Sequence, residues 1–202
     1  DILTGGAGAD VLDGGTGDDT FNNVGFGDTV VGGAGIDTVH LAGSVLQIDD
    51  DLTINLNTGE GLGSSWTDVE FVTGTLGRGN DNVTTGIQLQ HINDYGGVDS
   101  LTLDYSGELT DGRTATQINF MSDRDSNNLN QEVTLDDGST FTMAIRDFEI
   151  LNITGTVGDD RIDGSSGTAG NGRAGNILFG LGGNDILTGG AGADVLDGGT
   201  GD

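Results

Sequence analysis

A nine-residue repeat is the feature that most constrains how this chain folds. Residues 5–13 read GGAGADVLD, and the next nine, 14–22, read GGTGDDTFN. A degenerate copy, NVGFGDTVV, follows at 23–31, and GGAGIDTVH completes the run at 32–40. In every copy an aspartate stands two positions before a large apolar residue, and the same phase returns at 180–202. A short fixed period of this kind predicts stacked, repeated units rather than one globular core.

Each nonapeptide divides into a turn and a strand. Paired glycines permit positive φ and therefore favour a tight turn. The x-apolar-x triplet after the aspartate is long enough only for a very short strand, with one side chain pointing inward. Two nonapeptides then make one 18-residue coil of a solenoid, and one apolar residue in nine cannot build a deep core.

The aspartates of such a solenoid form rows along its edges, where they repel one another unless a cation neutralises them. Clustered carboxylates without cysteine or paired histidine are typical of sites for hard cations. Flexible spacing of oxygen ligands favours Ca²⁺ over Mg²⁺. The sequence therefore predicts several calcium ions.

The composition excludes several classes of protein and partner. The 202 residues include 33 acidic and 6 basic side chains, for a formal net charge of −27. A chain this acidic repels nucleic acid and anionic lipid surfaces. It has no apolar run near 18 residues, so we expect no membrane insertion. It has no cysteine, which excludes disulfides and thiolate metal sites.

The pattern GGxGxDxUx, where U is a large apolar residue, resembles the repeat of the repeats-in-toxin (RTX, or hemolysin-type) family. The resemblance is specific in 5–40 and 180–202 and weaker in 74–105 and 155–178. It implies an all-β fold built of calcium-binding parallel β-roll segments, interleaved here with small β-strand insertions. In that family each Ca²⁺ lies between same-side turns one coil apart, held by aspartate carboxylates and turn carbonyls.

Carried onto this chain, the resemblance pairs Asp10 with Asp28 and Asp19 with Asp37. Asn-Val at 23–24 replaces Gly-Gly and puts the geometry of the Asp28 turn in question, and Leu181 replaces a glycine of the Asp185 turn. The full set of metal ligands that it implies is Gly6, Gly8, Asp10, Gly15, Gly17, Asp19, Asp28, Gly33, Gly35, Asp37, Asp81, Asp99, Asp160, Asp185, Gly190, Gly192 and Asp194.

A weaker internal duplication suggests how the segments are ordered. Each half of the chain reads as a roll, a β insertion and re-entry into a roll. The predicted segments are an RTX roll at 1–40, a β insertion at 41–70, a degenerate roll at 71–105, a β insertion with a hairpin at 106–150 and an RTX roll at 151–202.

The insertions alternate polar and apolar residues, which predicts strands. This pattern covers 52–56 and 117–120, and it pairs 133–135 with 141–143 across the turn signal Asp-Asp-Gly at 136–138. No stretch has a sustained helical period.

A longer repeat is also present, because residues 1–18 and 185–202 are identical. We interpret the chain as one 184-residue unit of a tandem array together with the start of the next unit. The expected partners are then neighbouring copies of the same unit, with end-to-end self-assembly through exposed strand edges.

Other acidic and histidine residues are weak candidates for sites. Residues 123–127 have DxDxN spacing but lack the glutamate of a calcium loop, so a solvated loop is favoured. Residues 49–51, three aspartates, are interpreted as exposed charge. His40 and His91 have no partner at metal-ligand spacing and are interpreted as ordinary surface or turn residues.

A catalytic site is not expected. Glu70 and Glu149 occupy matching Asp-x-Glu segments, which raises the paired carboxylates of a glycosidase, but hydrogen bonding to the strand that enters a roll is favoured. The motifs GxSxG, HExxH and a phosphate-binding loop do not occur. Trp66 and Tyr105 could stack on a sugar, although core packing is favoured.

The sequence therefore predicts a calcium-binding structural module of a large secreted bacterial protein that serves adhesion, a surface layer or extracellular assembly. The resemblance further implies export of the unfolded chain by a one-step (type I) secretion system, with folding on Ca²⁺ outside the cell. The alternative is the calcium-binding accessory region of a secreted enzyme, such as an alginate epimerase, a protease or a lipase.

Overall fold

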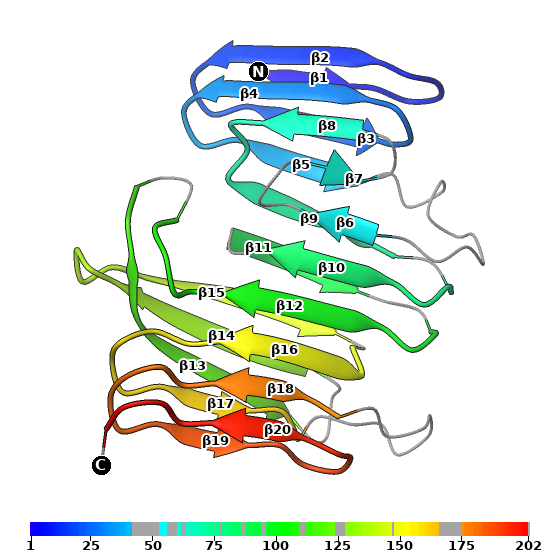
Figure 1. Ribbon diagram of the computed structural model, residues 1–202. Helices are drawn as coiled ribbons and strands as arrows, with labels where there is room; N and C mark the ends of the chain where they lie inside the picture. Colours follow the sequence, from blue (N-terminus) through cyan, green and yellow to red (C-terminus); the bar gives the residue numbers. More distant parts are fainter. Residues whose placement is uncertain are drawn as a thin grey trace. The chain divides into compact units, whose positions relative to one another are not determined.

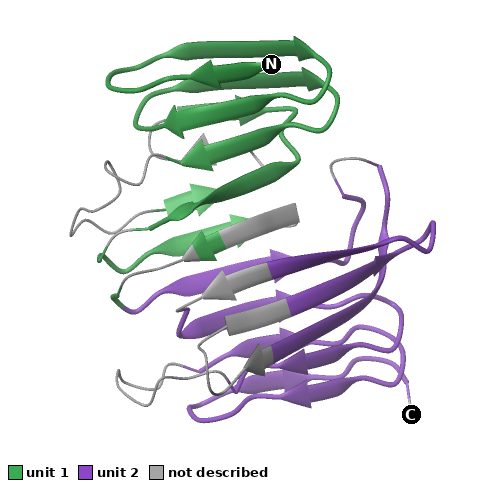
Figure 2. Ribbon diagram, turned by 180° about the vertical axis from the view of Figure 1, so that it is seen from behind, with its two compact units in different colours: residues 1–97 green, residues 98–202 purple. Residues whose placement is uncertain are grey.

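In the computed structural model every described element is a strand (Figure 1). The described residues are 1–41, 53–55, 60–61, 64–76, 78–85, 88–93, 96–109, 112–123, 128–146, 148–165 and 175–201. They contain no helix long and apolar enough to cross a membrane. The chain divides into two compact units, Asp1–Gly97 and Val98–Asp202 (Figure 2). The boundary lies inside the predicted segment 71–105.

Unit 1 places successive strands of the roll alternately in two sheets. Its strands are β1 (Ile2–Thr4), β2 (Val11–Thr16), β3 (Thr20–Val24), β4 (Thr29–Ala34), β5 (Thr38–Leu41), β6 (Thr53–Asn55), β7 (Glu60–Gly61), β8 (Ser64–Thr67), β9 (Phe71–Thr75), β10 (Asn82–Thr85) and β11 (Gln88–Asn93). One sheet has the order β1-β3-β5-β9-β11, and all its pairs are parallel. The other has the order β2-β4-β8-β7-β6-β10, in which β7 alone runs antiparallel to its neighbours.

The register of the first strands equals one coil. Ile2 pairs with Thr20, and Val11 with Thr29, so residues 18 apart in sequence lie side by side. Because each coil contributes one strand to each sheet, the nine-residue period becomes two opposed rows of turns. The predicted 18-residue coil is confirmed.

Unit 2 combines a roll with an antiparallel hairpin. Its strands are β12 (Ser100–Asp104), β13 (Ala115–Asp123), β14 (Asn128–Leu135), β15 (Thr140–Arg146), β16 (Ile150–Thr154), β17 (Arg161–Asp163), β18 (Ile177–Phe179), β19 (Ile186–Thr188) and β20 (Val195–Asp197). One sheet, β12-β16-β18-β20, is parallel. In the other, β15-β14-β13-β17-β19, the first three strands pair antiparallel and the rest parallel.

The predicted hairpin is confirmed in this unit. Val133 pairs with Phe141 across the turn at 136–138, and the amide of Gly138 donates to the carbonyl of Leu135 at 2.9 Å. Gly138 has φ 80°, which explains the glycine there. The predicted strand 117–120 lies within β13, and β6 covers 53–55 of the predicted strand 52–56.

The core of each roll consists of single inward side chains stacked from coil to coil. Leu12, Phe21, Val30 and Val39, the apolar positions of the nonapeptides, are at most 8% exposed. Trp66 continues the stack beside Val30. Burying each of these side chains contributes about 1.5–3 kcal/mol. The all-β class and the parallel sheets agree with the sequence prediction.

Candidate metal centres

The glycine turns between strands share one backbone conformation. Number the six turn residues of GGxGxD from one to six; the second and fourth residues then have φ between 76° and 149°. This holds in the turns 5–10, 14–19, 32–37, 180–185 and 189–194. In the turn 180–185 Leu181 takes this conformation at φ 76°, although it is disfavoured for a residue with a Cβ. The substitution of Leu181 for glycine therefore leaves the turn backbone intact.

Turns on the same side stack directly, backbone on backbone. A Cβ at Gly33 would lie 2.1 Å from the carbonyl oxygen of Gly15, and one at Gly35 would lie 2.3 Å from that of Gly17. The amide of Gly17 donates to the carbonyl of Ala34 at 2.7 Å. Only glycine permits this approach, so the predicted carbonyl ligands of one turn lie against the next turn.

The aspartates of neighbouring coils form a ladder. The amide of Asp10 donates to Oδ1 of Asp28 at 2.9 Å, and the amide of Asp19 donates to Oδ1 of Asp37 at 2.8 Å. The structure therefore brings together both predicted pairs. In unit 2 the amides of Asp160 and Asn176 donate in the same way to Oδ1 of Asp185 and of Asp194, at 2.9 and 2.8 Å.

The second carboxylate oxygen of four aspartates has no hydrogen-bond partner although it is buried. These atoms are Oδ2 of Asp10, Asp19, Asp37 and Asp185. A buried charged oxygen without a donor or a cation is strongly destabilising. Burial accordingly raises the pKa of Asp37 above its ordinary value. All four aspartates belong to turns with the shared glycine conformation, so among the described residues these four turns are candidates for a cation.

Other oxygens converge on the same places. At Gly14 a Cβ would lie 2.4 Å from Oδ2 of Asp19 and 2.7 Å from the carbonyl oxygen of Gly32 in the next coil. Among the described residues no three acidic, histidine or cysteine side chains are grouped to hold a metal. The carboxylate and carbonyl oxygens that are present are donors of the kind that Ca²⁺ takes.

Two predicted ligands differ from this group because the chain already satisfies them. Oδ2 of Asp28 accepts the amide of Gly25 at 2.7 Å, and Oδ2 of Asp160 accepts the amide of Thr156 at 2.6 Å. In the turn 23–28 positive φ occurs at Asn23 and Gly27, the first and fifth positions. The replacement of Gly-Gly by Asn-Val thus changed the turn.

The remaining predicted ligands are placed as follows. Asp81 and Asp99 are buried, at 1% and 0% exposure. Gly190 and Gly192 have the φ values of the shared turn, 90° and 136°. Asp194 is half-buried and accepts the ladder hydrogen bond described above.

Two glutamates, each at the end of a predicted insertion, take an aspartate's place in the ladder. Oε2 of Glu70 accepts the amide of Asp37 at 2.8 Å, and Oε2 of Glu149 accepts the amide of Asp99 at 2.9 Å. Burial raises the pKa of both glutamates. The predicted hydrogen-bonding role is thus found, but at the amide in front of β5 and of β12, the strands that precede the insertions, and not at the strand that enters the roll after each glutamate.

Sequence reasoning missed two residues at aspartate positions of the ladder. Ser64 accepts the amide of Asp28 at 3.1 Å, and Oδ1 of Asn176 accepts the amide of Leu151 at 2.9 Å. Each is followed two residues later by a buried apolar residue, Trp66 and Leu178. Both would have been found by a search for any side chain with an acceptor oxygen, and not only aspartate, two positions before a large apolar residue.

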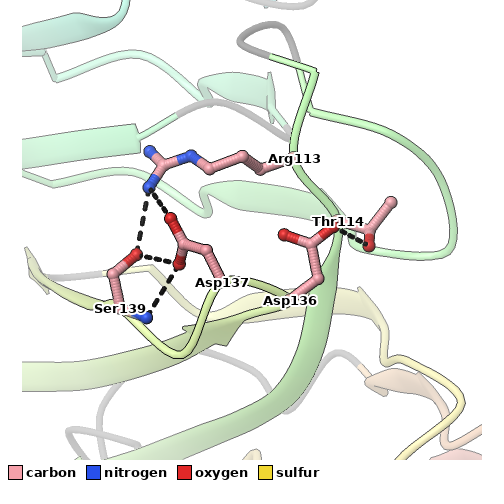
Figure 3. A network of polar contacts seen from close by, with 5 residues as sticks. All are labelled: Arg113, Thr114, Asp136, Asp137 and Ser139. Atoms are coloured by element: carbon pink, nitrogen blue, oxygen red, sulfur yellow. Dashed lines mark hydrogen bonds and ion pairs between the residues drawn. The ribbon is translucent and has the colours of Figure 1, made fainter.

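The hairpin turn shows how an exposed acidic cluster is neutralised without a metal (Figure 3). Nη1 of Arg113 lies 3.5 Å from Oδ2 of Asp137 and donates to Oγ of Ser139 at 3.0 Å. Hydrogen bonds from Ser139, with a smaller contribution from Arg113, lower the pKa of Asp137. Oγ1 of Thr114 donates to Oδ2 of Asp136 at 3.1 Å.

The other candidates have ordinary structural roles or lie outside the description. Nδ1 of His40 is 2.5 Å from Oγ1 of Thr73, and Trp66 and Tyr105 are buried, as predicted. The predicted loop 123–127 begins at the last residue of β13, Asp123. Its other residues, the side chain of His91 and the three aspartates at 49–51 lie outside the described residues.

A family model of the RTX calcium-binding nonapeptide repeat matches four segments, 1–23, 24–43, 152–168 and 171–202. The chain carries calcium-binding RTX repeats. RTX calcium-binding nonapeptide repeats bind Ca²⁺ at several sites. No curated protein matches the chain.

Proposed function

We propose that the chain is a calcium-dependent structural module whose rolls fold when Ca²⁺ binds outside the cell. The observation that carries the proposal is the buried second oxygen of Asp10, Asp19, Asp37 and Asp185. Ca²⁺ would bind these oxygens together with turn carbonyls, which include those of Gly15 and Gly17, and would cancel the repulsion along the ladder. Without the ion, glycine-rich backbone entropy opposes folding.

The proposed location is extracellular and bacterial. Calcium sites of extracellular modules have dissociation constants of about 10⁻⁴–10⁻³ M, far above cytosolic Ca²⁺. A chain whose folding depends on such sites stays unfolded inside the cell, as a one-step secretion system needs, and folds after export.

We further propose that the module is non-catalytic and that tandem copies assemble into a continuous roll for adhesion or a surface layer. The duplicated 18-residue segment supports this. In its first copy the carbonyl of Asp1 accepts the amide of Thr20 at 2.9 Å; in its second copy the amide of Ile186 donates to the carbonyl of Asp160 at 2.8 Å. The first copy therefore pairs with the following coil through a backbone carbonyl, and the second copy pairs with the preceding coil through a backbone amide. A coil in the interior of an array must form both kinds of contact.

Far-UV circular dichroism tests the calcium-dependent folding. We expect a largely disordered spectrum in chelator and a cooperative gain of β structure as CaCl₂ rises to about 0.1–1 mM, with little response to MgCl₂. A chain that is fully β-structured in chelator and indifferent to Ca²⁺ contradicts the proposal.

Sedimentation velocity in CaCl₂ tests the assembly. We expect a concentration-dependent increase in mass that chelator reverses. A strict monomer at high protein concentration counts against stacking between copies.

A further inference from the structure

Asn176 stands at an aspartate position of the ladder, and its amide group joins two coils. The side chain is 4% exposed. Its Oδ1 accepts the amide of Leu151 at 2.9 Å, as an aspartate Oδ1 does elsewhere in the ladder. Its Nδ2 donates to the carbonyls of Gly164 at 3.0 Å and Gly189 at 2.8 Å. Every polar atom of this side chain therefore has a partner within the chain.

The corresponding atoms at Asp19 are arranged differently. There Oδ2 and the carbonyl oxygen of Gly32 surround one point, at 2.4 and 2.7 Å from the place of a Cβ on Gly14. Gly14 and Gly32 begin consecutive turns on one side, as Gly164 and Gly189 do around Asn176. At Asp19 Oδ2 has no hydrogen-bond donor, although the N-terminal ammonium of Asp1 forms an ion pair with the other oxygen, Oδ1. At Asn176 an N–H group faces the carbonyl, which is attractive.

We propose that Asn176 is a calcium-free clamp: its amide hydrogen bonds hold two consecutive turns of unit 2 together where other turns use Ca²⁺. This inference rests on calcium binding by the other RTX turns, and it adds that the response to Ca²⁺ is not uniform along the chain. The coils at Leu151, Asn176 and Asp194 keep their pairing at low Ca²⁺, and the coils at Asp19 and Asp37 do not.

Two other turns use chain-supplied donors in the same way. Oγ of Ser64 donates to the carbonyl of Gly25 at 2.7 Å, in the turn whose amide satisfies Asp28. Oγ1 of Thr156 lies 3.0 Å from Oδ1 of Asp160 and supplements the backbone amide there.

Each clamp lies beside a ladder step longer than one 18-residue coil. Ladder partners are 36 residues apart at Ser64, 42 apart at Ile118 and Asp160, and 25 apart at Leu151 and Asn176. The step from Asn176 to Asp194 is again 18 residues, and the step from Asp37 to Glu70 is 33, so spacing alone does not decide which turn carries a clamp. What the clamps share is a hydrogen-bond donor supplied by a side chain.

Hydrogen exchange of the full chain, in chelator and in 10 mM CaCl₂, tests the proposal. The reporters are two ladder amides with the same geometry: Leu151, which donates to Asn176, and Asp19, which donates to Asp37. We expect Leu151 to stay protected in both buffers and Asp19 to be protected only with Ca²⁺. Equal exchange of the two amides at the unfolded rate in chelator overturns the clamp. Full protection of Asp19 in chelator instead contradicts calcium-dependent folding, so the two failures are distinguishable.

The second experiment repeats the hydrogen exchange on the variant Asn176→Asp. It keeps Oδ1 and replaces the donor with an anionic oxygen, so two hydrogen bonds are lost and Leu151 should lose about 10- to 100-fold of its protection in chelator. CaCl₂ should restore protection in the variant. Asn82→Asp is the control for the added charge, because Asn82 is exposed on β10. Unchanged exchange of Leu151 in Asn176→Asp overturns the proposal.

Discussion

Replacing Asp19 with asparagine reproduces at a calcium turn the arrangement found at Asn176. The variant keeps an acceptor oxygen, removes one buried negative charge and places an N–H group beside the carbonyl oxygen of Gly32. Both groups lie near Gly14: a Cβ on this residue would be 2.4 Å from Oδ2 of Asp19 and 2.7 Å from the carbonyl oxygen of Gly32. The variant also loses the ion pair of Asp19 with the exposed N-terminal ammonium, which contributes little. We therefore expect Asp19→Asn to be slightly more stable than the wild type without Ca²⁺ and to respond more weakly to Ca²⁺.

Both effects have a definite size. One or two new hydrogen bonds contribute about 0.5–1.5 kcal/mol each to the free energy of unfolding without Ca²⁺. Each bound ion makes that free energy rise by about 1.4 kcal/mol for every tenfold increase in Ca²⁺ above its dissociation constant. Losing the ion between the turns of Asp19 and Asp37 should lower the slope by that amount. Plots of unfolding free energy against log Ca²⁺ for wild type and variant should then cross.

Urea denaturation followed by circular dichroism, at several Ca²⁺ concentrations, measures the slope. Asp13→Asn is the matched control, because Asp13 is exposed on β2 and its change removes the same charge. An unchanged slope in Asp19→Asn would show that Asp19 binds no ion. A uniform loss of stability at every Ca²⁺ concentration would show that its role is only structural.

Three further predictions concern other contacts. Gly33→Ala should be far more destabilising than Gly15→Ala in thermal unfolding with Ca²⁺, because both have positive φ but only a Cβ at Gly33 meets a carbonyl, at 2.1 Å; equal losses would refute the close stacking. Glu149→Ala should cost about 1–3 kcal/mol, since a buried amide loses its acceptor, whereas Glu149→Gln should be nearly neutral; urea titration compares them. Burial raises the pKa of Glu70 and Glu149, so the folded state binds protons more tightly than the unfolded state. In chelator the residual β signal in circular dichroism should therefore increase from pH 7 to pH 5, and with Ca²⁺ the urea midpoint should fall because protons compete with the ion; the same sign in both buffers would contradict this.

The two predicted aspartate pairs show how much of the site the sequence contains. Asp10 with Asp28, and Asp19 with Asp37, follow from a period of nine, because two periods bring same-side turns together. The sequence could not tell that Asp28 is satisfied by the amide of Gly25, whereas Asp19 keeps a buried oxygen without a partner. That difference depends on the φ angles of two turns, and those angles depend on which turns stack.

The sequence also did not reveal that two residues near the insertions take part in the ladder. Ser64 and Asn176 look ordinary in sequence because their ladder partners are 36 and 25 residues away, not 18. A local pattern carries no information on which residue enters the ladder after an interruption.

The sequence by itself determined the repeating unit: the glycine turns, the short strands, the single inward apolar residue and the row of acidic side chains that requires a cation. These are local properties, set by backbone freedom, side-chain period and charge. Only the tertiary structure decided which carboxylates keep an unsatisfied buried oxygen and which are satisfied by the chain, because each carboxylate depends on the donors that the neighbouring coil presents to it.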